Sequence, residues 1–210
     1  PTPMTSGSEA SGIKVSADGR KLVYNQQQTI GHVWLAPLDG SPGHQVTFDD
    51  LDPRWPALSP DGNSIAYMTM VPEQVYLMDR DGSNRRMISS EGFSSGFPMW
   101  SPDGKWISFS AEPLRASAGD SGFYIVNAKD LQSPRIVARG GFGPVIWVDD
   151  TTVVVDQYWK SWLISVNSGT RTPFFVDSTW ARPVMSGQQI LFQEGRAGRE
   201  GWWTVSTEHH

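Results

Sequence analysis

The sequence repeats itself with a period of about 42 residues, and this repeat restricts the fold more than any other feature does. Three segments align directly, IKVSADGRKLVYNQ, PALSPDGNSIAYMT and PMWSPDGKWISFSA. Their Asp-Gly pairs begin at Asp18, Asp61 and Asp103, which are 43 and 42 residues apart. Two weaker copies, PVIWVDDTTVVVDQ and PVMSGQQILFQE, begin at Pro144 and Pro183. A period of this length is typical of the four-stranded blades of a β-propeller.

Each copy has the internal pattern of a four-stranded antiparallel sheet. In the third copy a short strand leads into Ser-Pro-Asp-Gly, where Pro and Gly suit a tight turn, and KWISFSA then returns with alternating apolar residues. The segments FYIVN and RIVA supply the third and fourth strands, and their counterparts elsewhere are rich in β-branched and aromatic residues. No segment shows a helical period. Residues 111–121 are expected to form a long insertion between the second and third strands of this copy.

The two ends of the chain suggest how the repeat closes. The fifth copy supplies three strands and ends with WWTVST, while PTPMTS at the start of the chain has the pattern of a fourth strand. We therefore expect one all-β domain, a five-bladed β-propeller of four-stranded antiparallel blades, with the N-terminal strand pairing in the last blade. The expected blades are residues 12–48, 53–89, 96–138, 143–175, and 182–207 together with 1–6. Residues 208–210 resemble the remnant of an affinity tag.

The runs LDPRWPALSPDGNSIAYMT, VYLMDRDGSNRRMIS and GFPMWSPDGKWISFSAEP resemble the repeats of the TolB-like β-propeller family. The resemblance is specific over residues 12–138 and degenerate over 143–207. It implies a β-propeller of the kind found in periplasmic TolB proteins of Gram-negative bacteria, in the N-terminal propellers of prolyl oligopeptidase relatives, and in sensor or scaffold domains of bacterial kinases and regulators. A periplasmic or other extracytoplasmic location is expected from this resemblance alone. The chain departs from the family pattern in showing five copies, where six or seven blades are usual.

Composition excludes several classes of function. The net charge of −5 provides no basic surface that would gather nucleic acid. No apolar run approaches the length of a membrane-spanning helix, so we expect no membrane insertion by this chain. The sequence has no Cys, which excludes disulfides and thiolate metal sites.

The sequence offers few candidates for catalysis or metal binding. Gly92-Phe93-Ser94-Ser95-Gly96 matches the G-x-S-x-G pattern of serine hydrolases, but it is expected in a loop between blades that is followed by a strand, and no suitable His follows it. The run from Asp79 to Asn84 resembles a calcium loop but lacks the distal Glu, and a hairpin turn explains it better. His32 and His44 lack a third metal ligand. The expected innermost strands contain no Asp or Glu, which argues against a glycosidase. We therefore expect no enzyme activity, no cofactor and no metal.

A binding surface remains, at the positions where the innermost strand of each blade begins. The equivalent positions are Gly12, Trp55, Phe97, Gly143 and Arg182. Aromatic and Arg side chains in concave sites supply buried area and orientation. The candidate ligand-binding residues are Asp52, Arg54, Trp55, Phe97, Trp180 and Arg182. The alternative is that Trp55 and Phe97 merely pack between blades.

These observations favour a non-catalytic binding or scaffold propeller that recognises a protein or peptide segment at one mouth of the ring. One alternative is a regulatory or sensor propeller that belongs to a multidomain bacterial peptidase or kinase. A second alternative is a carbohydrate-binding lectin, suggested by the 10 Trp residues. The chain is expected to be a monomer, and the sequence does not identify the ligand.

Overall fold

The computed structural model describes residues 9–15, 22–27, 30–115, 120–141, 143, 145–157, 160–175, 180–186, 189–194 and 201–206. Every regular element in these residues is a β-strand. None of them forms a helix, so none forms a helix that could cross a membrane. The chain divides into two compact units, Pro1–Gly31 and His32–His210.

The first unit contains one antiparallel pair of strands. Strand β1 (Glu9–Val15) pairs with β2 (Leu22–Gln27), and the register shifts between Ser11 and Lys14. The shift leaves two residues of β1 opposite one residue of β2, which is the pattern of a β-bulge.

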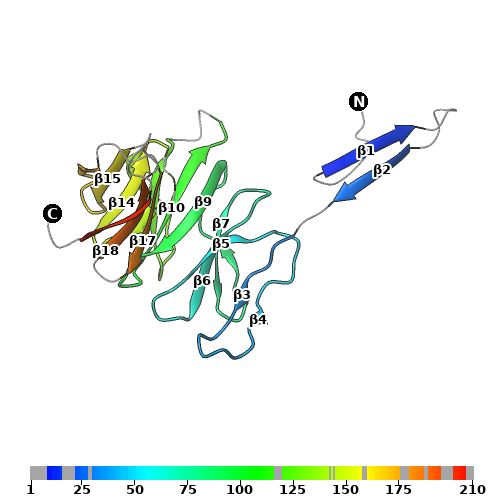
Figure 1. Ribbon diagram of the computed structural model, residues 1–210, viewed down its shortest axis with the longest axis horizontal. Helices are drawn as coiled ribbons and strands as arrows, with labels where there is room; N and C mark the ends of the chain where they lie inside the picture. The colour runs from blue at the N-terminus through cyan, green and yellow to red at the C-terminus, as the bar shows by residue number, and fades with distance from the viewer. Residues whose placement is uncertain are drawn as a thin grey trace. The chain divides into compact units, whose positions relative to one another are not determined.

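The second unit is a succession of antiparallel sheets in chain order (Figure 1). It begins with the short pair β3 (Trp34–Leu35) and β4 (His44–Gln45). The next sheet comprises β5 (Arg54–Leu58), β6 (Ser64–Met68), β7 (Val75–Asp79) and β8 (Arg86–Met87). It is followed by β9 (Phe93–Trp100), β10 (Trp106–Pro113), β11 (Gly122–Asn127) and β12 (Arg135–Arg139). The fourth group comprises β13 (Val145–Trp147), β14 (Thr152–Gln157), β15 (Lys160–Ser165) and β16 (Arg171–Phe175). The last comprises β17 (Trp180–Ser186), β18 (Gln189–Glu194) and β19 (Gly201–Ser206).

The predicted all-β class and the four-stranded antiparallel sheets are confirmed. The count of five blades and their boundaries stay predictions, because β1–β2 and β3–β4 are separate two-stranded sheets. The predicted closing strand, residues 1–6, lies outside the described residues.

The Ser-Pro-Asp-Gly turns join the first two strands of a sheet through the same set of hydrogen bonds. In the β9–β10 turn the Ser101 hydroxyl donates to Asp103 Oδ1 at 2.7 Å and accepts from the Trp106 N–H at 2.9 Å. The β5–β6 turn repeats this arrangement, with Ser59 Oγ donating to Asp61 and accepting from the Ser64 N–H. The Ser and Asp of the motif therefore hold the turn, while Gly supplies the positive φ.

The hydrophobic core lies between successive sheets. Phe109 and Ile107 of β10 pack with Ala66 and Leu77 of the preceding sheet and are almost fully buried. Burial of each such large side chain stabilises the fold by about 1.5–3 kcal/mol. A second cluster packs β11 and β12 against β13–β15, so each sheet is stabilised by its neighbour.

Two sequence expectations about the third copy are wrong. The G-x-S-x-G segment is not a loop, because Phe93–Gly96 form the first half of β9. The insertion also begins later than residue 111, because β10 continues to Pro113. The two extensions pair with each other, with Ala111 opposite Ser95 and Pro113 opposite Phe93. The sequence of each segment, taken by itself, predicts a loop. Each forms a strand here because the other segment supplies its hydrogen bonds.

Candidate functional site

The candidate site is the mouth, defined here as the region around two bulges, one near the start of β5 and one in the middle of β9. Both strands carry a bulge there. In β5 the register passes from Arg54 to Ala57, so Trp55 and Pro56 face the single residue Tyr67 of β6. A bulge of this kind bends a strand and redirects its side chains.

The bulge in β9 is equivalent to the one in β5. Gly96 pairs with Ser110 and Met99 with Ser108, so Phe97 and Pro98 lie opposite the intervening Phe109. The two bulges therefore share an aromatic residue followed by Pro, with another aromatic residue across the ladder.

Trp55 and Phe97 both adopt a left-handed backbone conformation, with φ of 50° and 59°. Residues other than Gly rarely adopt this left-handed conformation, because their Cβ atom then comes too close to the following carbonyl oxygen. Their rings contact each other edge to face, with centroids 5.3 Å apart and planes at 65°. Trp55 remains 52% exposed, so the pair is accessible to solvent. We call Trp55 and Phe97 the aromatic pair.

The register also shifts at other positions that the sequence alignment makes equivalent. In β1 the register shift falls across Gly12, and in β17 it falls between Trp180 and Val184, across Arg182. In the sheet that starts with β13, the equivalent Gly143 precedes the strand. A Gly-Pro sequence at this position can turn the chain without side-chain strain.

Asp52 and Arg54 flank the aromatic pair and pair with each other. The Arg54 guanidinium donates to Asp52 Oδ2 at 3.0 Å. Asp52 is a third residue of the predicted site with a positive φ, 47°. The Arg54 side chain is 44% exposed and the Asp52 side chain 19%, and a surface ion pair of this kind adds little stability, about 0–1 kcal/mol.

The structure brings together only part of the predicted site. Asp52, Arg54, Trp55 and Phe97 lie together at the mouth. Trp180 and Arg182 lie on β17, and their side chains are outside the described part of the chain.

Sequence reasoning missed the polar residues beside Phe97. Ser94 donates a hydrogen bond to the carboxylate of Glu73, and Glu112 is the cross-strand partner of Ser94. The Ser95 N–H donates to the Glu73 carbonyl oxygen at 3.0 Å. These contacts link the β6–β7 loop to β9, the first strand of the next sheet.

The other sequence candidates have structural roles. In the turn from Asp79 to Asn84 the Asp79 carboxylate accepts from the Asn84 amide at 2.7 Å, as expected for a hairpin turn. Burial alone would raise the pKa of Asp49, but hydrogen bonds from Arg85 and the Leu51 N–H lower it overall, and the charge of His32 adds to this. The described residues contain no group of three or more potential metal ligands.

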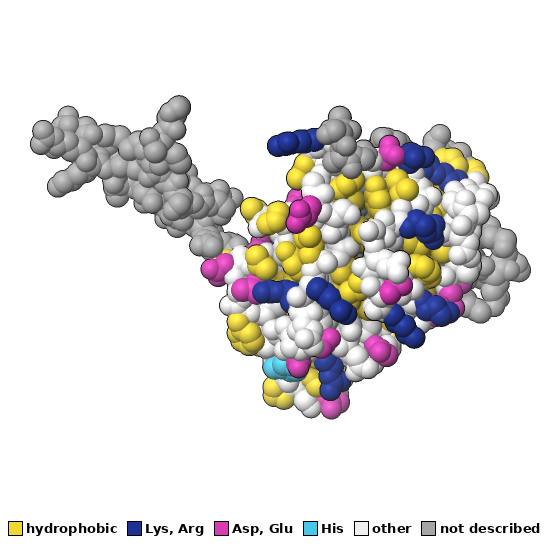
Figure 2. Space-filling view, turned by 180° about the vertical axis from the view of Figure 1, so that it is seen from behind, with side chains coloured by type: hydrophobic (Ala, Val, Ile, Leu, Met, Phe, Trp, Pro, Cys, Tyr) yellow, Lys and Arg dark blue, Asp and Glu magenta, His cyan; other side chains and the backbone are white. Residues whose placement is uncertain are grey.

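Charged groups of both signs alternate with hydrophobic side chains on the face shown in Figure 2. This face therefore presents a mixed surface, on which apolar contacts and individual polar groups determine what binds.

Comparison with solved structures defines the class of protein. TolB from Acinetobacter baumannii matches 95% of this chain and 52% of its own, with 19% sequence identity and a TM-score of 0.61. A nidogen/laminin complex matches 78% of this chain and 64% of its own, with 13% identity and a TM-score of 0.63. Acylaminoacyl peptidase from Pyrococcus horikoshii matches 93% of this chain over 36% of its own length, with 14% identity and a TM-score of 0.56.

The chain has the β-propeller fold. Within that class it resembles TolB and spans about half the length of the TolB chain from Acinetobacter baumannii. The resemblance to TolB-like propellers is therefore confirmed at the level of the fold. No protein-family model matches the sequence, and no curated protein is similar enough in sequence to match it.

Proposed function

We propose that this chain is a non-catalytic binding or scaffold propeller that recognises a protein or peptide segment at the mouth. The observation that supports this proposal most directly is the aromatic pair. Two large apolar side chains stand in equivalent bulges, touch each other and remain accessible to solvent.

Backbone strain supports a role in binding rather than in packing. A left-handed conformation costs about 1–2 kcal/mol at a residue other than Gly, and such strain is concentrated at functional sites. An exposed Trp and a half-buried Phe beside an Arg supply apolar area and an orienting charge, and residues of these types are enriched at the centres of protein interfaces.

The arrangement around Ser94 favours a non-catalytic role. A serine nucleophile needs a general base within hydrogen-bonding distance, and this base is usually His. The Ser94 hydroxyl donates to the Glu73 carboxylate, and the four His residues of the sequence stand at 32, 44, 209 and 210.

We extend the proposal to the partner and the location. The partner is a protein or peptide, the chain acts as a monomer, and the location is periplasmic or extracytoplasmic, by analogy with the TolB structures it resembles. One alternative, a lectin, is favoured by the exposed indole of Trp55 beside two charged groups. The other alternative is a regulatory propeller of a larger enzyme. It is favoured because this chain matches only part, 36%, of a longer peptidase chain.

Selection from a displayed library of random peptides tests the proposal. Peptides selected on the wild-type chain should bind the Trp55→Gly variant at least about 30-fold more weakly, as for an interface hot spot. The matched control is Met87→Ala, which removes a 38% exposed apolar side chain from β8, the last strand of its sheet. This control should bind the peptides as the wild type does.

Three outcomes would overturn the proposal. Equal binding of the selected peptides to both variants would place recognition elsewhere. Binding to a glycan array that disappears with Trp55→Gly, without any peptide binding, would establish the lectin. Hydrolysis of an ester or peptide that disappears with Ser94→Ala would establish an enzyme.

A further inference from the structure

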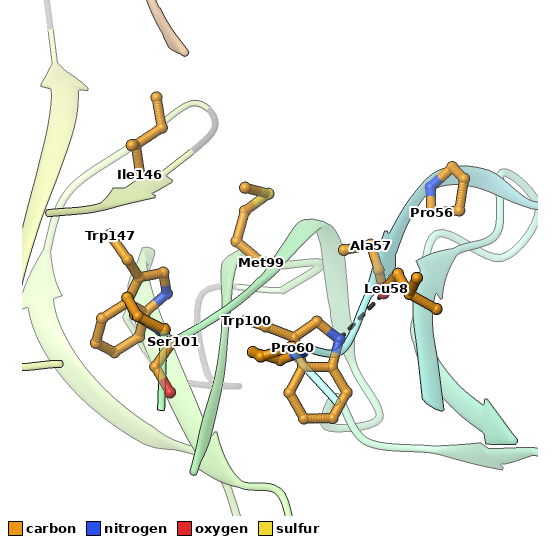
Figure 3. Close-up of a pocket in the computed structure, with 10 residues that line it drawn as sticks. Pro56, Ala57, Leu58, Pro60, Met99, Trp100, Ser101, Ile146 and Trp147 are labelled. Atoms are coloured by element: carbon orange, nitrogen blue, oxygen red, sulfur yellow. Dashed lines mark hydrogen bonds between the residues drawn. The ribbon is translucent and has the colours of Figure 1, made fainter. Parts of the chain in front are cut away.

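A hollow of about 550 Å³ lies beside the same first strands, at the positions that follow the aromatic pair toward the Ser-Pro-Asp-Gly turns. Strands β5, β9 and β13 all contribute to its lining. Figure 3 shows Met99 between Ile146 and Trp147 on one side and Ala57 and Leu58 on the other. This volume lies in the range of small-molecule sites, about 300–1,000 Å³.

The lining of the hollow is apolar. It contains no charged side chain, and Pro56, Pro60 and Pro102 contribute no backbone N–H group. Leu58 and Met99 are 49% and 37% exposed, so apolar surface is accessible to whatever enters the hollow. Exposed apolar surface in a concave site favours an apolar occupant.

The polar side-chain groups of the lining already have partners within the protein. The indole N–H of Trp100 donates to the Ala57 carbonyl oxygen at 3.0 Å (Figure 3). The indole N–H of Trp147 donates to Ser108 Oγ at 3.0 Å. The Ser101 hydroxyl donates a hydrogen bond to Asp103 and accepts one from the Trp106 N–H. A polar or charged ligand would therefore lose its hydration here without gaining new hydrogen bonds from these groups, which is unfavourable.

We propose that this hollow is a second binding site, distinct from the mouth, that takes an uncharged apolar molecule of small-molecule size. The ligand contacts Leu58 and Met99 and the faces of Trp100 and Trp147, whose N–H groups are directed into the protein. Recognition depends on shape and apolar area, since the side chains that line the site offer no free charge.

Titration with N-phenyl-1-naphthylamine, an uncharged apolar fluorophore, tests this site in the full chain. We expect saturable binding to the wild type and at least about tenfold weaker binding to Met99→Lys, because Lys brings a charge without a partner against an apolar ligand. Met87→Lys is the matched control, since Met87 is 38% exposed on β8 and lies outside the hollow. It should bind as the wild type does.

A second measurement does not depend on the fold of any variant. With ¹³C-methyl methionine in the wild type, the fluorophore should shift the Met99 resonance and leave that of Met87 unchanged. The proposal is overturned if the wild type shows no saturable binding, if Met99→Lys binds like Met87→Lys, or if the Met99 resonance does not move.

Discussion

Gly82 in the turn between β7 and β8 lies directly against the carbonyl oxygen of Val46, where a Cβ added to Gly82 would stand 2.4 Å from that oxygen. The relationship recurs further along the chain, where a Cβ on Gly169 would stand 2.7 Å from the Val137 carbonyl oxygen. Both glycines have positive φ, 87° and 71°. The turn between the third and fourth strands of a sheet therefore presses its backbone against the preceding strands, with no room for a methyl group.

Replacing Gly82 by Ala should destabilise the protein more than the same change at Gly62. Gly62 also has a positive φ, 72°, but has open space around it, so Gly62→Ala should cost about 1–2 kcal/mol through the backbone alone. Gly82→Ala adds the collision with Val46 and should cost at least about 1 kcal/mol more. Urea unfolding of both variants measures the difference. Equal losses would show that the contact with Val46 relaxes at no cost.

The left-handed conformation of Trp55 predicts an unusual order of stability among substitutions. At an ordinary strand position Ala is preferred to Gly, because Gly loses more conformational entropy. At Trp55 the order should reverse, with Trp55→Gly more stable than Trp55→Ala by about 1 kcal/mol, because Gly accepts a φ of 50° without strain. Thermal melting of the two variants measures this. If Ala is the more stable, the positive φ is not imposed by the bulge.

Two buried hydroxyls should respond to removal in opposite ways. Ser108 Oγ accepts from Trp147 and donates to the Met99 carbonyl oxygen at 3.1 Å, so Ser108→Ala leaves a buried indole N–H unpaired and should cost about 1–3 kcal/mol. Ser95 Oγ is buried and has no hydrogen-bond partner among the described residues. Ser95→Ala removes only an unsatisfied polar atom, so stability should stay unchanged or rise. The free energies of unfolding of the two variants decide between these outcomes, and a clear loss for Ser95→Ala would contradict the second.

Asp103 should contribute to the acid sensitivity of the fold. The Lys105 ammonium at 2.7 Å, together with hydrogen bonds from the Lys105 N–H and from Ser101, lowers the pKa of Asp103 from 3.8 to about 2, although burial opposes the shift. Because the folded pKa lies below the unfolded value, the carboxylate stabilises the fold above about pH 4, and this contribution is lost as the pH falls toward about 2.

The variant Asp103→Asn isolates this contribution. It should melt at a lower temperature than the wild type at pH 6, and the two melting temperatures should converge as the pH approaches 2. Thermal melts across this pH range measure the difference between the two melting temperatures. A difference that does not change with pH would show that the charge of Asp103 contributes nothing to stability.

Much of the fold and part of the site could be predicted from particular residues. The spacing of Asp61 and Asp103 predicted two successive sheets, because Ser-Pro-Asp-Gly specifies its turn through local hydrogen bonds. The alignment also identified Trp55 and Phe97 as equivalent, and the structure places both in the same kind of bulge. The paired extension of β9 and β10 was missed, because Ser94 and Glu112 favour a strand only when they lie opposite each other.

The sequence by itself determined the repeat, the turns and the all-β class, because these depend on alternation and on turn chemistry within a few residues. Only the tertiary structure decided the positive φ of Trp55, its contact with the ring of Phe97, and the hollow next to Met99. The φ of Trp55 depends on the pairing of β5 with β6. The other two features depend on segments about 40 residues apart in the chain that meet only when one sheet packs against the next. Local pattern fixes which residues form strands, and packing between sheets fixes what those strands present to a ligand.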